Sequence, residues 1–118
     1  MKVTIEELES YLFERYENKV DEQSLFMKSV EEIGEVAEIL NKRNGRKKVG
    51  SEDLEIELGK ELADVIHYVV AIAAVNNLDL NDIILSKDKK ASLKYNCDIN
   101  LEQFISSKRN IPVIQNTP

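Results

Sequence analysis

The sequence has few of the residues that build disulfide-bonded or all-β proteins. Its 118 residues include one cysteine, four glycines, two prolines and no tryptophan. The single Cys97 excludes an internal disulfide and fits a reducing compartment, and so few glycines and prolines argue against a chain of short strands and tight turns. Because only one histidine is available to activate it and its surroundings are polar, we interpret Cys97 as an ordinary free thiol.

Long apolar runs and a basic surface are also missing. The longest apolar run, residues 65–75, is too short to span a bilayer, and the first residues contain no apolar signal core. The net charge of −6 argues against a nucleic-acid polymer as partner, but it allows a nucleotide substrate, because metal ions and local lysines can neutralise phosphates. We therefore predict a cytoplasmic protein with no membrane partner.

What the chain does contain is helical periodicity. Thr4 and Glu7 match a capping box, and apolar residues recur at helical spacing along four long segments. We expect helices over residues 4–17, 23–43, from a cap at Ser51 to 75 or 77, and 80–95, then a short helical piece over 101–106 and a loose tail from 111.

Long helices with short connections predict an all-α fold, an antiparallel four-helix bundle. The segment that follows Asp64 is apolar nearly all round, so it should be buried nearly all round. A four-helix chain of this size has too little surface to cover such a segment. We therefore expect a second copy to complete the bundle, in a homodimer or a homotetramer.

Two acidic pairs interrupt the apolar faces of the second and third expected helices. On a helical wheel Glu32 and Glu61 fall inside the apolar arcs, and Glu35 and Asp64 follow one turn later near the edges of those arcs. Solvated faces or salt bridges to lysines are the alternative, but they do not fit Glu32 and Glu61, whose azimuths lie inside the apolar arcs, where an unpaired carboxylate is costly. A divalent cation is the simplest counter-charge. Mg²⁺, with Mn²⁺ as the alternative, prefers oxygen ligands and leaves positions for substrate phosphates.

These pairs resemble the signature of the MazG-like, all-α nucleoside triphosphate pyrophosphohydrolases. Residues 31–35, EEIGE, and 61–68, ELADVIHY, match an ExxE on one helix and an ExxD on the next, and the similarity covers roughly residues 22–96. The resemblance implies an all-α MazG-like domain over 1–97, followed by a partly flexible C-terminal extension over 98–118. It implies metal-dependent hydrolysis of a (deoxy)nucleoside triphosphate to the monophosphate and pyrophosphate, for house-cleaning or pool control.

The same resemblance implies roles for individual residues. It makes Glu32, Glu35, Glu61 and Asp64 both metal ligands and catalytic residues, one glutamate of the set removing a proton from the attacking water. It also implies substrate-binding residues on the fourth expected helix, Lys87, Lys94 and Tyr95, with Lys90 beside them. Tyr68 follows Asp64 by four residues and lies near the azimuth of Glu61, so it is a candidate substrate contact, with a core aromatic as the alternative.

The chain departs from the family pattern at two positions. Ala91 stands where many members have an asparagine, which removes one expected polar contact to the substrate, and Lys90 is the candidate replacement. Asn96 stands where many members have a proline after the tyrosine.

Other interpretations stay open at this stage. The chain could be a non-catalytic, metal-stabilised helical oligomer that binds a nucleotide or a protein partner. A redox di-iron bundle needs two carboxylate–histidine motifs, and His67 is the single histidine, so we interpret it as a buried or interface residue. Tyr16 stands at helical spacing, where a core role is commoner than stacking on a base. Gly34 and Gly59, beside the acidic pairs, would allow close helix approach or room for a ligand.

Overall fold

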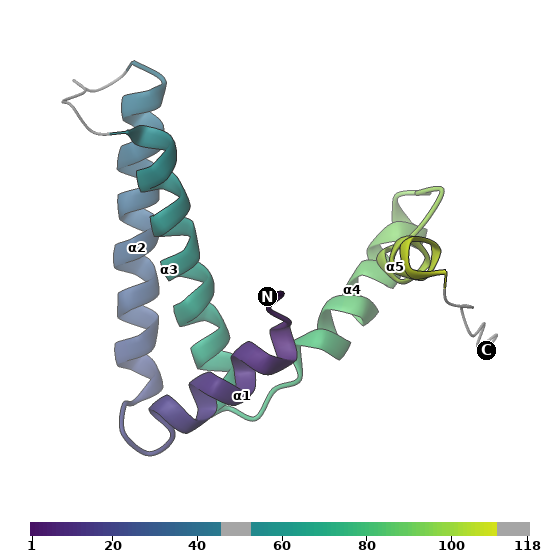
Figure 1. Ribbon diagram of the computed structural model, residues 1–118, viewed down its shortest axis with the longest axis horizontal. Helices are drawn as coiled ribbons and strands as arrows, with labels where there is room; N and C mark the ends of the chain where they lie inside the picture. Colours follow the sequence, from purple (N-terminus) through teal and green to yellow (C-terminus); the bar gives the residue numbers. More distant parts are fainter. Residues whose placement is uncertain (46–52, 111–118) are drawn as a thin grey trace. The chain divides into compact units, whose positions relative to one another are not determined.

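The computed structural model describes residues 1–45 and 53–110, and its regular elements in these ranges are all helices (Figure 1). They are α1 (Ile5–Tyr16), α2 (Glu22–Arg43), α3 (Leu54–Val75), α4 (Leu80–Lys94) and α5 (Leu101–Arg109). No strand occurs in the described ranges, so the all-α prediction is confirmed. Within the same ranges, no helix is both long and apolar enough to cross a lipid bilayer.

The chain divides into two compact units. The first, Met1–Leu78, contains α1, α2 and α3, and the second begins at Asp79 and contains α4 and α5. The division into residues 1–97 and 98–118 and the completion of the bundle by a second copy stay predictions.

Short polar side chains set the helix starts. At α1 the predicted capping box is present: Thr4 Oγ1 accepts from the Glu7 amide at 3.1 Å, and Glu7 Oε1 accepts from the Thr4 amide at 3.0 Å. At α3 the cap is Asp53, whose Oδ1 accepts from the amides of Glu55 and Ile56. The expected cap, Ser51, lies outside the described residues.

Asparagines end four of the five helices. Asn18, Asn77, Asn96 and Asn110 follow α1, α3, α4 and α5, each with a φ of 55°. Asparagine tolerates this left-handed conformation better than most residues, whereas proline is held near a φ of −65°. Asn96, which stands where the resemblance predicts a proline, therefore ends α4 with a turn that proline could not form.

Within the first unit, α2 and α3 lie side by side and antiparallel, and α1 packs near the end of α3 (Figure 1). The buried apolar residues are Leu12 on α1, Leu25 and Ile39 on α2, and four residues towards the end of α3. Those four are Val70, Ala71, Ala73 and Ala74. Small alanines allow close packing on this side of α3, and they fix the face that α3 turns towards its neighbours.

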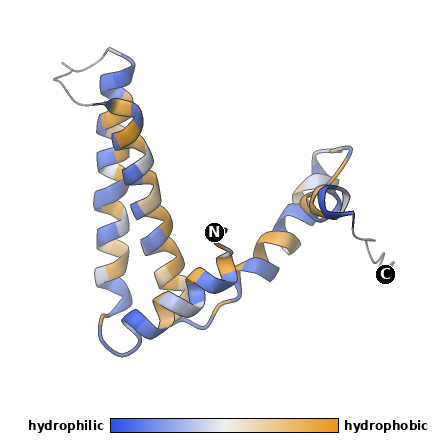
Figure 2. Ribbon diagram, in the orientation of Figure 1, coloured by the Kyte–Doolittle hydropathy of each residue, from blue (hydrophilic) through white to orange (hydrophobic). Residues whose placement is uncertain are grey.

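Burial of α3 nearly all round, which the sequence predicts only with a second copy present, is not reached within the described chain. Apolar residues extend along α3 (Figure 2), yet Leu62, Ile66 and Val69 are exposed, with 53% of Ile66 accessible to solvent. On α2, Val30 and Ile33 are exposed as well. The first unit therefore presents apolar surface that its own helices leave uncovered.

Candidate metal centre

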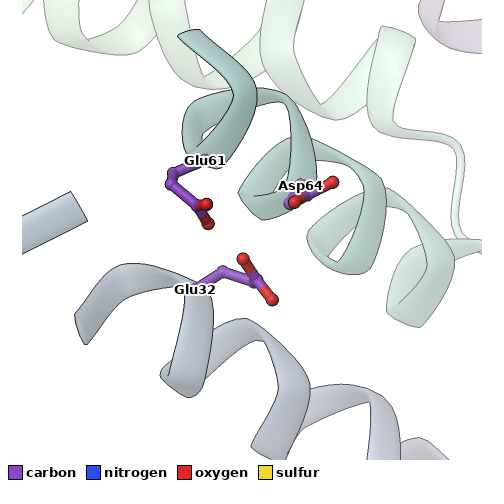
Figure 3. A group of neighbouring side chains, drawn as sticks. All are labelled: Glu32, Glu61 and Asp64. Carbon is purple, nitrogen blue, oxygen red and sulfur yellow. The ribbon is translucent and has the colours of Figure 1, made fainter. Parts of the chain in front are cut away.

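Three of the four predicted carboxylates meet between α2 and α3 (Figure 3). One carboxylate oxygen each from Glu32, Glu61 and Asp64 lies within 4.8 Å of the other two. Glu61 and Asp64 are three residues apart on α3, so both face α2, and Glu32 faces them from the antiparallel neighbour. Glu32 and Glu61 are half-buried and Asp64 is exposed.

Glu61 is the most constrained member of this acidic cluster. Its Oε2 is buried, and no donor within the described part of the chain reaches it. The carboxylates of Glu32 and then Glu35 lie close enough to share its proton, and with burial and their charges they raise the pKa of Glu61 to about 8. Glu35 is exposed and stands outside the group of three, yet it interacts directly with Glu61.

The charges around the cluster leave a cation as its natural occupant. Lys28 of α2 pairs with Glu31 at 3.3 Å, and Lys60 of α3 pairs with Glu57 at 3.6 Å, so the ion pairs of both ammonium groups are with carboxylates outside the cluster. Lys28 also interacts with Glu32, but its interaction with Glu31 is stronger. The buried Glu61 Oε2 and the all-oxygen donor set are the chemistry that a hard divalent ion requires. The residues present therefore fit a divalent cation.

Tyr68 and His67 follow the cluster on α3 and are half-buried. The Tyr68 ring lies edge-on to the His67 ring, with centroids 4.9 Å apart and an interplanar angle of 72°. The His67 Nε2 is hydrogen-bonded to the Tyr16 hydroxyl of α1 at 2.8 Å. Burial, and to a smaller degree the charge of Arg15, lowers the pKa of His67, while Asp64 opposes the shift.

The other predicted substrate-binding residues belong to the second unit. Lys87, Lys90 and Lys94 lie on α4 and Tyr95 caps its C-terminus, and all four are exposed. The Lys94 ammonium lies 5.4 Å from the centroid of the Tyr95 ring, a cation–π contact. Their role towards a substrate stays a prediction.

The two glycines beside the acidic pairs do not mark a close approach of the helices. A Cβ added at Gly34 or Gly59 would meet no atom of the described chain within 4 Å. The expectation of close helix approach is therefore wrong for the chain as described. Room for a ligand stays a prediction.

Sequence reasoning did not find the contact between Tyr16 and His67. The two residues are 51 positions apart, and helical periodicity gives the face of each residue but not its partner on another helix. It also did not single out Lys28, which interacts electrostatically with both Glu32 and Tyr68. Its position one turn before Glu32 on α2 was the available signal.

No curated protein matches the chain. The family model of the MazG nucleotide pyrophosphohydrolase domain matches residues 20–95, which is more than half of the chain. That range includes the acidic cluster, Glu35 and all five predicted substrate-binding residues. The chain belongs to the MazG nucleotide pyrophosphohydrolase family.

Proposed function

We propose that the protein is a divalent-metal-dependent hydrolase that converts a (deoxy)nucleoside triphosphate into the monophosphate and pyrophosphate. The observation that carries the proposal is the meeting of Glu32, Glu61 and Asp64 within 4.8 Å, with a buried Glu61 oxygen that has no donor among the described residues. The match to the MazG family supports a nucleoside triphosphate as the substrate.

The carboxylates of Glu32, Glu61 and Asp64 are the proposed ligands of Mg²⁺ or, alternatively, Mn²⁺. When bound, the ion would neutralise phosphate charge and acidify a water. Three carboxylates already converge to within 4.8 Å of one another, so little reorganisation accompanies binding. The half-burial of Glu32 and Glu61 strengthens this field by excluding part of the solvent.

Glu35, which the resemblance also makes a fourth metal ligand, is the proposed general base. It is exposed, stands outside the group of three and interacts directly with Glu61, so it is available to accept a proton from the attacking water. That water forms a bond to the α-phosphorus while the bond from this phosphorus to the oxygen bridging to the β-phosphate breaks. Pyrophosphate leaves with the electron pair of that bond. Lys87, Lys90 and Lys94, with Tyr95 and Tyr68, are the proposed contacts to the substrate.

Product analysis tests the proposal directly. The protein is incubated with a panel of canonical and modified triphosphates plus Mg²⁺ or Mn²⁺, and pyrophosphate is assayed separately from orthophosphate. We expect equal amounts of monophosphate and pyrophosphate, with the rate lowered by about a hundredfold or more in Glu35→Gln and Asp64→Asn. Glu55→Gln, an exposed change on α3 away from the cluster, is the control and should keep the wild-type rate. Orthophosphate as the main product would refute the proposal.

The non-catalytic alternative keeps one specific observation in its favour. Ala91 is exposed on α4 where many family members have an asparagine, so a polar substrate contact is missing at that position. Nucleotide binding with no product from any triphosphate would favour this binding function. Homo-oligomerisation and a cytoplasmic location stay predictions in either case.

A further inference from the structure

A hydrogen-bonded aromatic group connects α1 to α3 directly beside the acidic cluster. The Tyr16 hydroxyl and His67 Nε2 are 2.8 Å apart, and their rings meet edge to face with centroids 5.7 Å apart and an interplanar angle of 88°. The His67 ring in turn contacts Tyr68 edge to face at 4.9 Å. All three side chains are half-buried, so the group is partly shielded from competing water.

The last member of this group shares a face with the acidic cluster. Tyr68 follows Asp64 by four residues and Glu61 by seven, spacings that place the three on one side of α3. Lys28 of α2 interacts electrostatically with both Tyr68 and Glu32, so Tyr68 also lies near the α2 side of the cluster. A substrate held at the cluster would therefore extend over or beside the Tyr68 ring.

The hydrogen bond with Tyr16 restricts rotation of the His67 imidazole, and the orientation of the imidazole in turn restricts the Tyr68 ring. An imidazole with free nitrogens can rotate about its last side-chain torsion, whereas one whose Nε2 is held by a hydroxyl on another helix keeps a single orientation. Aromatic edge-to-face contacts depend on ring orientation. A fixed His67 ring therefore favours one orientation of Tyr68.

We propose that Tyr16 and His67 are positioning residues: their hydrogen bond orients Tyr68 for contact with the nucleoside part of the substrate. This inference rests on the proposed function for its kinetic consequence. Neither Tyr16 nor His67 needs to touch the substrate for the mechanism to operate. Because the nucleoside is remote from the reacting phosphorus, misplacement of Tyr68 should weaken substrate binding and leave the chemical step largely intact.

The test compares Tyr16→Phe with Tyr11→Phe. Both variants remove one hydroxyl from α1 and keep the ring, but the Tyr11 hydroxyl contacts Arg15 of its own helix, at 3.4 Å, rather than α3. We expect Tyr16→Phe to raise KM by about fivefold, the factor for loss of one ordinary hydrogen bond, with kcat nearly unchanged. Tyr11→Phe should leave both constants at wild-type values.

A spectroscopic readout makes the test independent of turnover. His67 is the single histidine, so ¹⁵N spectra of the imidazole report on this residue alone. Tyr16→Phe should change the imidazole tautomer balance and shift the ¹³C signals of the Tyr68 ring, and Tyr11→Phe should do neither. A third variant, His67→Gln, places an amide near Nε2, which retains a partner for Tyr16 but removes the ring beside Tyr68. It should raise KM as Tyr16→Phe does, and it decides the question if Tyr16→Phe fails to fold.

The outcomes separate this inference from the proposed function. If Tyr16→Phe and Tyr11→Phe show the same KM and the same Tyr68 ring signals, the positioning role is refuted even in an active enzyme. If the wild type releases no pyrophosphate from any triphosphate, the proposed function fails. In that case, a change in the ¹³C signals of the Tyr68 ring that occurs in Tyr16→Phe but not in Tyr11→Phe supports the orientation of Tyr68 through the hydrogen bond. Unchanged Tyr68 ring signals in Tyr16→Phe refute it.

Discussion

Binding of Mg²⁺ should tighten steeply with pH because Glu61 must lose a proton before it can act as a ligand. In the metal-free protein the proton shared with Glu32 and Glu35, together with burial, raises the pKa of Glu61 to about 8. Below that pH the cation competes with this proton. The affinity for Mg²⁺ should therefore increase about tenfold per pH unit well below pH 8, rise by about fiftyfold in total between pH 6 and pH 8, and level off about one unit above pH 8.

Isothermal titration calorimetry measures both the affinity and the proton. Titrations with Mg²⁺ and Mn²⁺ in two buffers of different ionisation enthalpy should show release of about one proton per ion at pH 6 and almost none at pH 9. Glu61→Gln cannot lose that proton, so it should bind the ion more weakly and with little pH dependence over the same range. Glu55→Gln, whose change lies away from the cluster, should follow the wild type.

Two results would contradict this reasoning. A wild-type affinity that is flat between pH 6 and pH 8 would show that Glu61 is already ionised in the metal-free protein. An equal pH slope in wild type and Glu61→Gln would assign the released proton to another group.

Three further predictions concern stability and assembly. With EDTA present, the melting temperature in differential scanning fluorimetry should fall as the pH rises from about 4.5 to about 8, because folding raises the pKa of the Glu61 carboxyl from 4.5 to about 8 and this group stabilises the folded state only while it is protonated. Excess Mg²⁺ should remove this fall. A fall of equal size in Glu61→Gln would contradict the assignment to Glu61. Leu12→Ala, at a side chain with 0% exposure on α1, should lower the free energy of unfolding by about 2–5 kcal/mol in urea titrations, whereas Val3→Ala, with 74% exposure, should change it little. Ile66→Glu, on the exposed apolar surface of α3, should convert an oligomer to a monomer, as measured by size-exclusion chromatography with light scattering. The far-UV circular dichroism spectrum should stay helical. An unchanged mass would place the interface elsewhere.

Local signals in the sequence predicted the helices well. The Thr4–Glu7 capping box depends on neighbours three residues apart, so the sequence alone contains it. The sequence predicts a cap at Ser51, which lies outside the described residues, whereas the structure caps α3 with Asp53; both are good caps, and the sequence does not rank them. Asp53 stands directly before the first turn of α3, where its carboxylate accepts hydrogen bonds from the amides of Glu55 and Ile56.

The sequence predicts which carboxylates lie near one another, but not how each of them is placed relative to the others. The azimuths of Glu32 and Glu61 on their helices indicated inward carboxylates, and both are half-buried. Glu35 and Asp64 looked equivalent at the edges of their arcs, yet Asp64 joins the group of three and Glu35 stands beside it. The axial register of α2 against α3 makes this difference, and periodicity along one helix contains no information on register. For the same reason, the contact between Tyr16 and His67 could not be predicted from the sequence.

The position of the cluster explains why one helix pair combines carboxylates with uncovered apolar surface. The first unit buries few large side chains, chiefly Leu12, Leu25 and Ile39, and packs α3 through alanines. Converging carboxylates oppose the packing of α2 against α3 whenever they are ionised together. A cation at the cluster removes that repulsion, and a second molecule on the apolar surface would add the burial that the single chain lacks. The bound cation and the partner subunit would both act on this helix pair. Each would therefore favour the arrangement of α2 and α3 that the other requires.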